Sequence, residues 1–175
     1  MYKAFGYNSE QEGEIMEEFY QKISYFLEKH GFLKKTVLFF TKYFPYFVLI
    51  VYPCLLFYLL ITKNSMLIHA TLKPLVAFLF VTILRKIIHR PRPFEIFSIE
   101  PLISHKSGES FPSRHCVSAF IIAFVCFYAN NIFGILMCII ALLLSIGRIL
   151  CGVHFISDVL CSFFIAGIIF IVKIF

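Results

Sequence analysis

A histidine, an aspartate and an arginine lie close together near the end of this otherwise apolar sequence. His154 follows Arg148 after five intervening residues, and Asp158 lies four residues beyond His154. Residues four apart share one helix face, so Asp158 can accept a hydrogen bond from one imidazole nitrogen and fix the tautomer of His154. The other nitrogen is then available as a nucleophile. The alternative is structural: Asp158 caps a helix beside an interfacial histidine and an arginine that extends to the membrane surface.

A second polar cluster, Pro112-Ser113-Arg114-His115, comes directly before a long apolar stretch. At the start of a helix, unpaired backbone N–H groups and the helix dipole favour an anion such as phosphate. Ser113 adds a hydroxyl donor, and His115 can protonate a leaving oxygen as a general acid. Taken alone, a serine at this place can also serve only as a helix cap.

The remaining cluster concentrates cations within residues 85–93, which read Arg-Lys-Ile-Ile-His-Arg-Pro-Arg-Pro. Positive residues commonly flank membrane helices, and this explains many such runs. Here two prolines stiffen the segment, which favours guanidinium groups held in place against phosphate oxygens.

The elements that position these clusters are predicted to be membrane helices. Among 175 residues, 60% are hydrophobic and 15% are charged, which is far more apolar than a soluble domain. At about 20 residues per span, the chain can cross the bilayer about five times. The predicted spans are residues 43–62, 65–88, two within 116–147 that separate at Asn130-Asn131 and Gly134, and 155–175. The fold class is therefore an all-α helical membrane bundle, with the connection 89–114 and the turn 148–154 on one face.

The N-terminal part of the chain follows a different pattern. Residues 10–30 carry apolar side chains at helical spacing among charged neighbours, which predicts an amphipathic helix. This helix either lies on the membrane surface or packs on the protein's own core. We therefore expect an interfacial segment over residues 1–35 and a transmembrane domain over 36–175. The acidic N-terminus lacks the pattern of a cleavable signal peptide.

Other polar residues within the apolar stretches are predicted to be structural. His69 and Lys73 lie near the start of the second span, where a long amine can reach the interface. Lys173 is expected in the last turn of the last helix, where its charge complements the helix dipole. Without any Cys-x-x-Cys pair, the six cysteines are interpreted as small core residues: Cys54, Cys116, Cys126, Cys138, Cys151 and Cys161.

The three polar clusters together match a known pattern in order and spacing. Over roughly residues 66–172 the sequence resembles the type 2 phosphatidic acid phosphatase and vanadium haloperoxidase superfamily. That family pattern is Lys, six residues, Arg-Pro; then Pro-Ser-Gly-His; then Ser-Arg, five residues, His, three residues, Asp. The corresponding pieces are Arg85 to Arg92-Pro93, Pro112-Ser113-Arg114-His115, and Gly147-Arg148 to His154 and Asp158.

The resemblance implies a role for each matched residue. It implies that His154 attacks phosphorus to form a phosphohistidine, that Asp158 orients His154, and that His115 protonates the leaving group and later activates water. The implied ligands of the phosphoryl oxygens are Arg85, Arg92, Ser113, Arg148 and the backbone amide of Arg114. No metal ion and no other cofactor is expected. Phosphoryl transfer depends mainly on positioning and charge neutralisation, which agrees with these roles.

Three residues depart from the family pattern. Arg85 replaces the lysine, which keeps the charge but changes the geometry of its donors. Arg114 replaces the glycine and adds a cation at the pocket mouth that can meet a second phosphate or a lipid headgroup. Gly147 replaces the serine, so one hydroxyl donor to phosphate is absent from this position.

The function implied by the resemblance is hydrolysis of a lipid phosphate monoester or diphosphate that enters sideways from the bilayer. The small size, the five spans and Arg114 favour an isoprenyl diphosphate such as undecaprenyl diphosphate, as in compact bacterial members. Phosphatidic acid or phosphatidylglycerol phosphate is the alternative substrate. A transporter or channel with an ion path through Arg148, His154 and Asp158 is the alternative of another class. A haloperoxidase is excluded, because known members of that type are soluble.

The charge of the chain indicates its partners. The formal net charge is +6, but the basic residues lie between apolar spans, so anionic lipid or phosphate is expected and nucleic acid is not. We expect a multi-pass protein of the cell membrane, and the resemblance implies an active site on the extracytoplasmic face.

Overall fold

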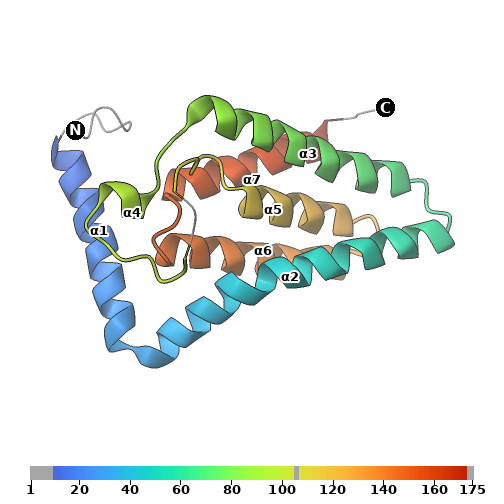
Figure 1. The fold of residues 1–175 in the computed structure, drawn as a ribbon. Helices are drawn as coiled ribbons and strands as arrows, with labels where there is room; N and C mark the ends of the chain where they lie inside the picture. Colours follow the sequence, from blue (N-terminus) through green and yellow to red (C-terminus); the bar gives the residue numbers. More distant parts are fainter. Residues whose placement is uncertain (1–9, 105–106, 173–175) are drawn as a thin grey trace.

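The computed structural model describes residues 10–104 and 107–172, and every regular element within them is a helix. Helices α2, α3, α5, α6 and α7 form a bundle, and α1 crosses one end of it beside the short α4 (Figure 1). The predicted all-α fold is confirmed. The helices are α1 Glu10–Lys29, α2 Gly31–Ile61, α3 Leu67–Ile88, α4 Pro93–Ile96, α5 Arg114–Cys126, α6 Asn131–Leu150 and α7 Ile156–Ile171.

Large apolar side chains cover the outer faces of the bundle. Leu49, Phe57, Ile83, Ile132 and Phe164 are each more than half exposed. The segments long and apolar enough to cross a membrane are Gly31–Ile61, Leu67–Ile96 and Asn131–Leu150, while α5 and α7 are shorter apolar helices. Such surfaces are stable against lipid and not against water, so this is a membrane protein.

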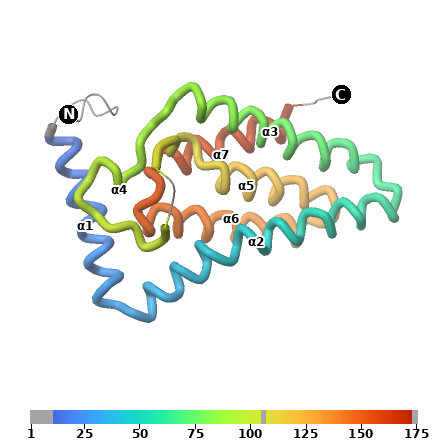
Figure 2. Tube along the Cα trace, in the orientation of Figure 1, coloured from blue at the N-terminus to red at the C-terminus, as the bar shows by residue number. Residues whose placement is uncertain are grey.

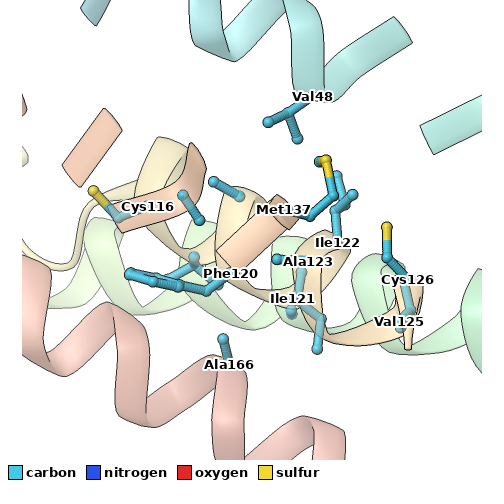
Figure 3. Close-up of a cluster of buried hydrophobic side chains, with 14 of the residues drawn as sticks. Val48, Cys116, Phe120, Ile121, Ile122, Ala123, Val125, Cys126, Met137 and Ala166 are labelled. Carbon is cyan, nitrogen blue, oxygen red and sulfur yellow. The ribbon is translucent and has the colours of Figure 1, made fainter. Parts of the chain in front are cut away.

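Helix α5 forms the centre of the bundle, between α3, α6 and α7 (Figure 2). Its side chains are buried on nearly all sides, and Phe120 and Ile121 pack among Met137 of α6 and Ala166 of α7 (Figure 3). A helix that is apolar all round is stable only when other helices enclose it. The first residues of α5 are therefore held in a fixed place relative to α3, α6 and α7.

The boundaries of α2 and α6 differ in part from the predicted spans. Helix α2 begins at Gly31 and not near residue 43, because apolar residues continue its pattern between the cations, and it runs through Pro45 and Pro53. The predicted boundary between residues 35 and 36 lies inside this helix, so the division into 1–35 and 36–175 stays a prediction. The separation of α5 from α6 is confirmed, and the Asn130 side chain caps α6 by accepting from the N–H of Ile132 at 2.8 Å.

Two small residues inside the bundle have roles that differ from the prediction. Gly134 does not form the turn but lies inside α6, where an added Cβ would come within 2.5 Å of the Phe127 ring. Cys54 is exposed on α2 and is not a core residue, whereas Cys116, Cys126 and Cys151 are buried as predicted.

At the far end of the bundle, the side chain of Lys73 turns into the protein and does not extend along its outer surface. Its side chain is buried, and its amine donates to the backbone carbonyl of Phe170 in the last turn of α7. Carbonyls at a helix C-terminus lack helical partners, which makes them good acceptors for a buried cation. The predicted position of Lys173 lies outside the described residues.

Candidate active site

The three polar clusters predicted from the sequence lie at the end of the bundle that α1 crosses (Figures 1 and 2). Arg85 lies in the last turn of α3, and Ser113 is the N-cap of α5. Arg148 lies in the last turn of α6, His154 in the connection to α7, and Asp158 in the first turn of α7. Helix ends from four parts of the chain therefore supply the candidate residues.

His154 and Asp158 are in contact as their spacing predicts. The distance from His154 Nδ1 to Asp158 Oδ2 is 3.4 Å, and both side chains are buried. On the other side of the ring, Nε2 lies 3.5 Å from Nη1 of Arg92. A carboxylate only accepts and a guanidinium only donates, so both neighbours favour the tautomer with its proton on Nδ1. The lone pair of Nε2 then points towards the cations of the site.

Burial determines the protonation state of His154. Desolvation lowers the pKa of His154 to about 4, although the hydrogen bond and charge of Asp158 act in the opposite direction. The imidazole is therefore neutral near pH 7, which is the form that can act as a nucleophile.

Asp158 has two further side-chain partners that the sequence reasoning missed. Arg90 Nη1 lies 3.0 Å from Asp158 Oδ1, and the Ser110 hydroxyl donates to Oδ2. Arg90 also lies over the Phe155 ring, 4.2 Å from its centroid. The carboxylate is thus fixed from both sides. The cation-rich segment 85–93 was a signal for Arg90, but nothing in the sequence pattern indicated Ser110.

Helix α1 contacts the backbone at the candidate nucleophile, which the sequence reasoning also missed. The Tyr20 hydroxyl donates to the His154 carbonyl at 3.0 Å. The Tyr20 ring packs with Phe97 and Phe155, at centroid distances of 5.9 and 6.2 Å. The apolar periodicity left open whether α1 lies on the membrane surface or packs on the protein, and its contact with this loop required the structure. Ile15 and Phe26 remain exposed on the same helix, so it packs on the protein and also presents apolar side chains outwards.

The three candidate phosphate-binding arginines are buried. Arg85 Nη1 donates to the Pro112 carbonyl at 2.8 Å, and Arg92 Nη1 donates to the Val153 carbonyl at 2.9 Å. Carbonyls orient a guanidinium group without neutralising its charge. Within the described residues, the one carboxylate in ion-pair range of Arg85, Arg92 or Arg148 is Glu109, at 3.8 Å from Arg85 Nε.

Several buried polar atoms at this end of the bundle have no hydrogen-bond partner among the described residues. They include Nε of Arg85, Nε of Arg148 and the hydroxyl of Ser113. Each belongs to a different one of the three clusters. Buried donors are rarely left unpaired in native proteins, because each costs about 1–3 kcal/mol. A tetrahedral oxyanion has enough acceptor sites for all three groups.

Arg114 and His115 lie in the first turn of α5, where both are exposed to a cavity of about 840 Å³. Arg148 and Lys42 line the same cavity, whose remaining wall includes apolar side chains of α2, α5 and α6. His154 is 1% exposed and does not line it. The cavity therefore meets the buried cluster through His115 and Arg148. Within residues 10–104 and 107–172, no group of three or more histidine, cysteine, aspartate or glutamate side chains is arranged so that it could hold a metal ion.

Known proteins resemble the chain in sequence and in fold. It is 38% identical over 79 residues to the undecaprenyl-diphosphatase BcrC of Bacillus subtilis (strain 168), covering 45% of this chain and 41% of that protein. It is 31% identical over 137 residues to the bacitracin transport permease protein BcrC of Bacillus licheniformis, covering 75% of this chain and 66% of that protein. The matches thus span less than two thirds of either relative's length.

A solved structure and a family model extend this similarity. The crystal structure of Aquifex aeolicus LpxE superposes with a TM-score of 0.71 and 27% sequence identity, covering 88% of this chain and 91% of that one. Residues 55–174 match the model of the PAP2 superfamily, and this range contains all eight candidate site residues. The chain therefore belongs to the PAP2 superfamily.

Proposed function

We propose that the protein hydrolyses a phosphate monoester or diphosphate of a membrane lipid through a phosphohistidine on His154. The observation that carries the proposal is that Arg85, Ser113 and Arg148 each hold a buried, unpaired donor at the end of the bundle that contains the His154–Asp158 pair. An arrangement of buried cations around a neutral histidine suits an anionic group that is attacked at its centre.

The cavity supports a lipid as the carrier of the phosphate. Its polar end includes Arg114, His115 and Arg148, whereas Pro45, Val48 and other apolar residues line the rest. A ligand with a charged head and a long apolar tail satisfies both parts, because each part is in contact with groups of matching polarity.

The proposed reaction has two steps. His154 Nε2 attacks phosphorus, the bond from phosphorus to the leaving oxygen breaks, and His115 donates a proton to that oxygen. Water then attacks the phosphohistidine, His115 takes one proton from the water, and the N–P bond breaks to release inorganic phosphate. Asp158 holds the Nδ1 proton throughout, and the arginines neutralise the equatorial oxygens.

An isoprenyl diphosphate such as undecaprenyl diphosphate is the favoured substrate. Arg114 places a further cation at the cavity mouth, and the Bacillus subtilis relative is named an undecaprenyl-diphosphatase. Phosphatidic acid or phosphatidylglycerol phosphate is the alternative substrate within the same chemistry. A transport function is the alternative of another class, since the Bacillus licheniformis relative is named a transport permease.

We further propose a multi-pass arrangement in which α2, α3, α5, α6 and α7 each cross the bilayer. The apolar outer faces of α2, α3, α6 and α7 support it, and α5 is the apolar helix that they enclose. Residues 1–35 are then the interfacial segment and residues 36–175 the transmembrane domain, with the active site on the extracytoplasmic face.

The test is phosphate release by the detergent-purified protein from undecaprenyl diphosphate, undecaprenyl phosphate, phosphatidic acid and phosphatidylglycerol phosphate. We expect release from at least one of them, with undecaprenyl diphosphate fastest and EDTA without large effect. His154→Ala and His115→Ala are each expected to lower kcat roughly 10³-fold or more, because they remove the nucleophile and the proton donor.

His30→Ala is the matched control, since this histidine is exposed between α1 and α2. Its rate is expected to equal that of the wild type. Release from none of the four lipids, or an undiminished rate in His154→Ala, contradicts the proposed function and leaves the transport alternative.

A further inference from the structure

Thr41 of α2 lies against the position where this chain departs from its family pattern. A Cβ added to Gly147 would collide with the Thr41 hydroxyl oxygen, so this hydroxyl occupies the space of a side chain at residue 147. Gly147 directly precedes Arg148, and Thr41 itself is 1% exposed. The lack of a side chain at Gly147 thus has a physical reason, which is the close approach of α2 to α6.

Thr41 is also part of the cavity wall. It lines the cavity together with His115 and Arg148. At present the hydroxyl donates to the Val37 carbonyl at 2.7 Å, and the Cys151 thiol lies 3.6 Å from its oxygen. Rotation about the C–O bond redirects the proton without moving the side chain. A hydrogen bond to an anionic oxygen is stronger than one to a neutral carbonyl, which favours that rotation when an anion is bound.

We propose that Thr41 is a substrate-binding residue whose hydroxyl donates to a phosphoryl oxygen held by Arg148. The donor that a serine at residue 147 would provide comes here from a different helix. This inference rests on the proposed function for the nature of the anion. Thr41 lies outside residues 55–174, which match the family model, so the contact is a feature of this chain's N-terminal part.

The experiment compares Thr41→Val, which keeps the shape and removes the hydroxyl, with Thr41→Ser, which keeps the hydroxyl. We measure kcat/KM for phosphate release and the affinity for inorganic vanadate, a phosphate analogue, by calorimetry. Thr41→Val is expected to lower both by roughly tenfold or more, as for loss of a charge-assisted hydrogen bond, and Thr41→Ser to stay within about threefold of the wild type. Thr36→Val is the matched control, because Thr36 donates to the Phe32 carbonyl in the same helix but is not part of the cavity wall.

A double variant tests whether the hydroxyl can be moved to the other helix. In Thr41→Ala with Gly147→Ser, the new Cβ lies 3.5 Å from the Cβ of residue 41, an ordinary contact distance. We expect it to recover most of the loss seen in Thr41→Ala alone. Wild-type rates and vanadate affinity in Thr41→Val overturn the proposal. If the wild type releases no phosphate, the proposed function fails, while vanadate binding still tests Thr41.

Discussion

Helix α3 carries a buried cation near each of its ends, and the two have different surroundings. Lys73 and Arg85 are 5% and 4% exposed, and both lie on the face of α3 that turns into the bundle. The Lys73 amine meets the Phe170 carbonyl and lies over the rings of Tyr128 and Phe170, at 5.9 and 5.0 Å from their centroids. A helix terminus and two aromatic faces stabilise this charge.

The surroundings of Arg85 instead leave one of its N–H donors without an acceptor. The buried Arg92 is a neighbouring cation, Glu109 Oε2 lies 3.8 Å from the Arg85 Nε, and this Nε has no hydrogen-bond partner within the described residues. Within the described residues, five buried side-chain atoms lack a hydrogen-bond partner. One of them, Nδ1 of His69, lies near Lys73. The other four belong to the end that contains Arg85: they are atoms of Arg85, Ser113, Ser145 and Arg148. A buried cation that meets a protein acceptor and aromatic faces suits a structural role, whereas neighbouring cations with unpaired donors suit a site for an anion.

Replacing each cation by methionine gives the sharpest test of this difference. Arg85→Met is expected to lower kcat/KM by roughly 10²–10³-fold, because it removes a preorganised donor to the charge that develops on phosphate. Lys73→Met is expected to stay within about threefold in activity but to lower the free energy of unfolding by about 1–3 kcal/mol, because it leaves the Phe170 carbonyl without this donor.

Phosphate release and chemical denaturation in detergent measure the two effects. A large activity loss in Lys73→Met at unchanged stability contradicts the distinction, as does full activity in Arg85→Met.

The sequence predicted the parts of the site that depend on local spacing. The interval of four residues placed His154 against Asp158, and Asn130 marked the start of α6, because one helix turn determines both contacts. The partners of Asp158 depend on the fold: Ser110 is 48 residues away and Arg90 is 68 residues away. Tyr20 lies 134 residues from His154, and no periodicity in the sequence relates two segments so far apart.

The dependence on long-range packing also explains where the helices of the bundle differ from the prediction. Proline commonly ends or kinks a helix, but α2 continues through Pro45 and Pro53 as one helix. Gly134 was interpreted as a turn residue because glycine is common in turns, but the Phe127 ring requires the missing side chain. Tertiary packing decides between these uses of the same residue type.

The pH dependence of kcat/KM tests whether burial keeps His154 neutral and able to act as a nucleophile. Desolvation disfavours the imidazolium form, so the pKa of His154 falls from 6.5 to about 4. The nucleophile is deprotonated above that value, and the acid limb that it causes is expected near pH 4, with a tenfold fall per pH unit below it. His30→Ala is expected to keep this limb and is the control. An acid limb centred at pH 6.5 and due to His154 contradicts the desolvated environment.

The smallest expected effect concerns the contact between α1 and the loop that carries His154. Tyr20→Phe keeps the ring packing with Phe97 and Phe155 and removes the hydrogen bond from the hydroxyl to the His154 carbonyl. Because that bond positions the backbone of His154 and does not touch substrate, kcat is expected to fall about 3–10-fold with KM within twofold. Steady-state phosphate release gives both parameters, and a melting curve in detergent records stability.

Tyr25→Phe is the matched control, since Tyr25 is on the same helix and 72% exposed. A lower kcat in Tyr20→Phe alone identifies α1 as an element that positions His154. At the Lys73 end, by contrast, loss of a buried hydrogen bond is expected to change stability and not activity. Equal kcat in the two tyrosine variants shows that α1 contributes packing to this end of the bundle and does not position His154. A raised KM with unchanged kcat instead indicates that α1 acts on substrate entry, which contradicts a positioning role.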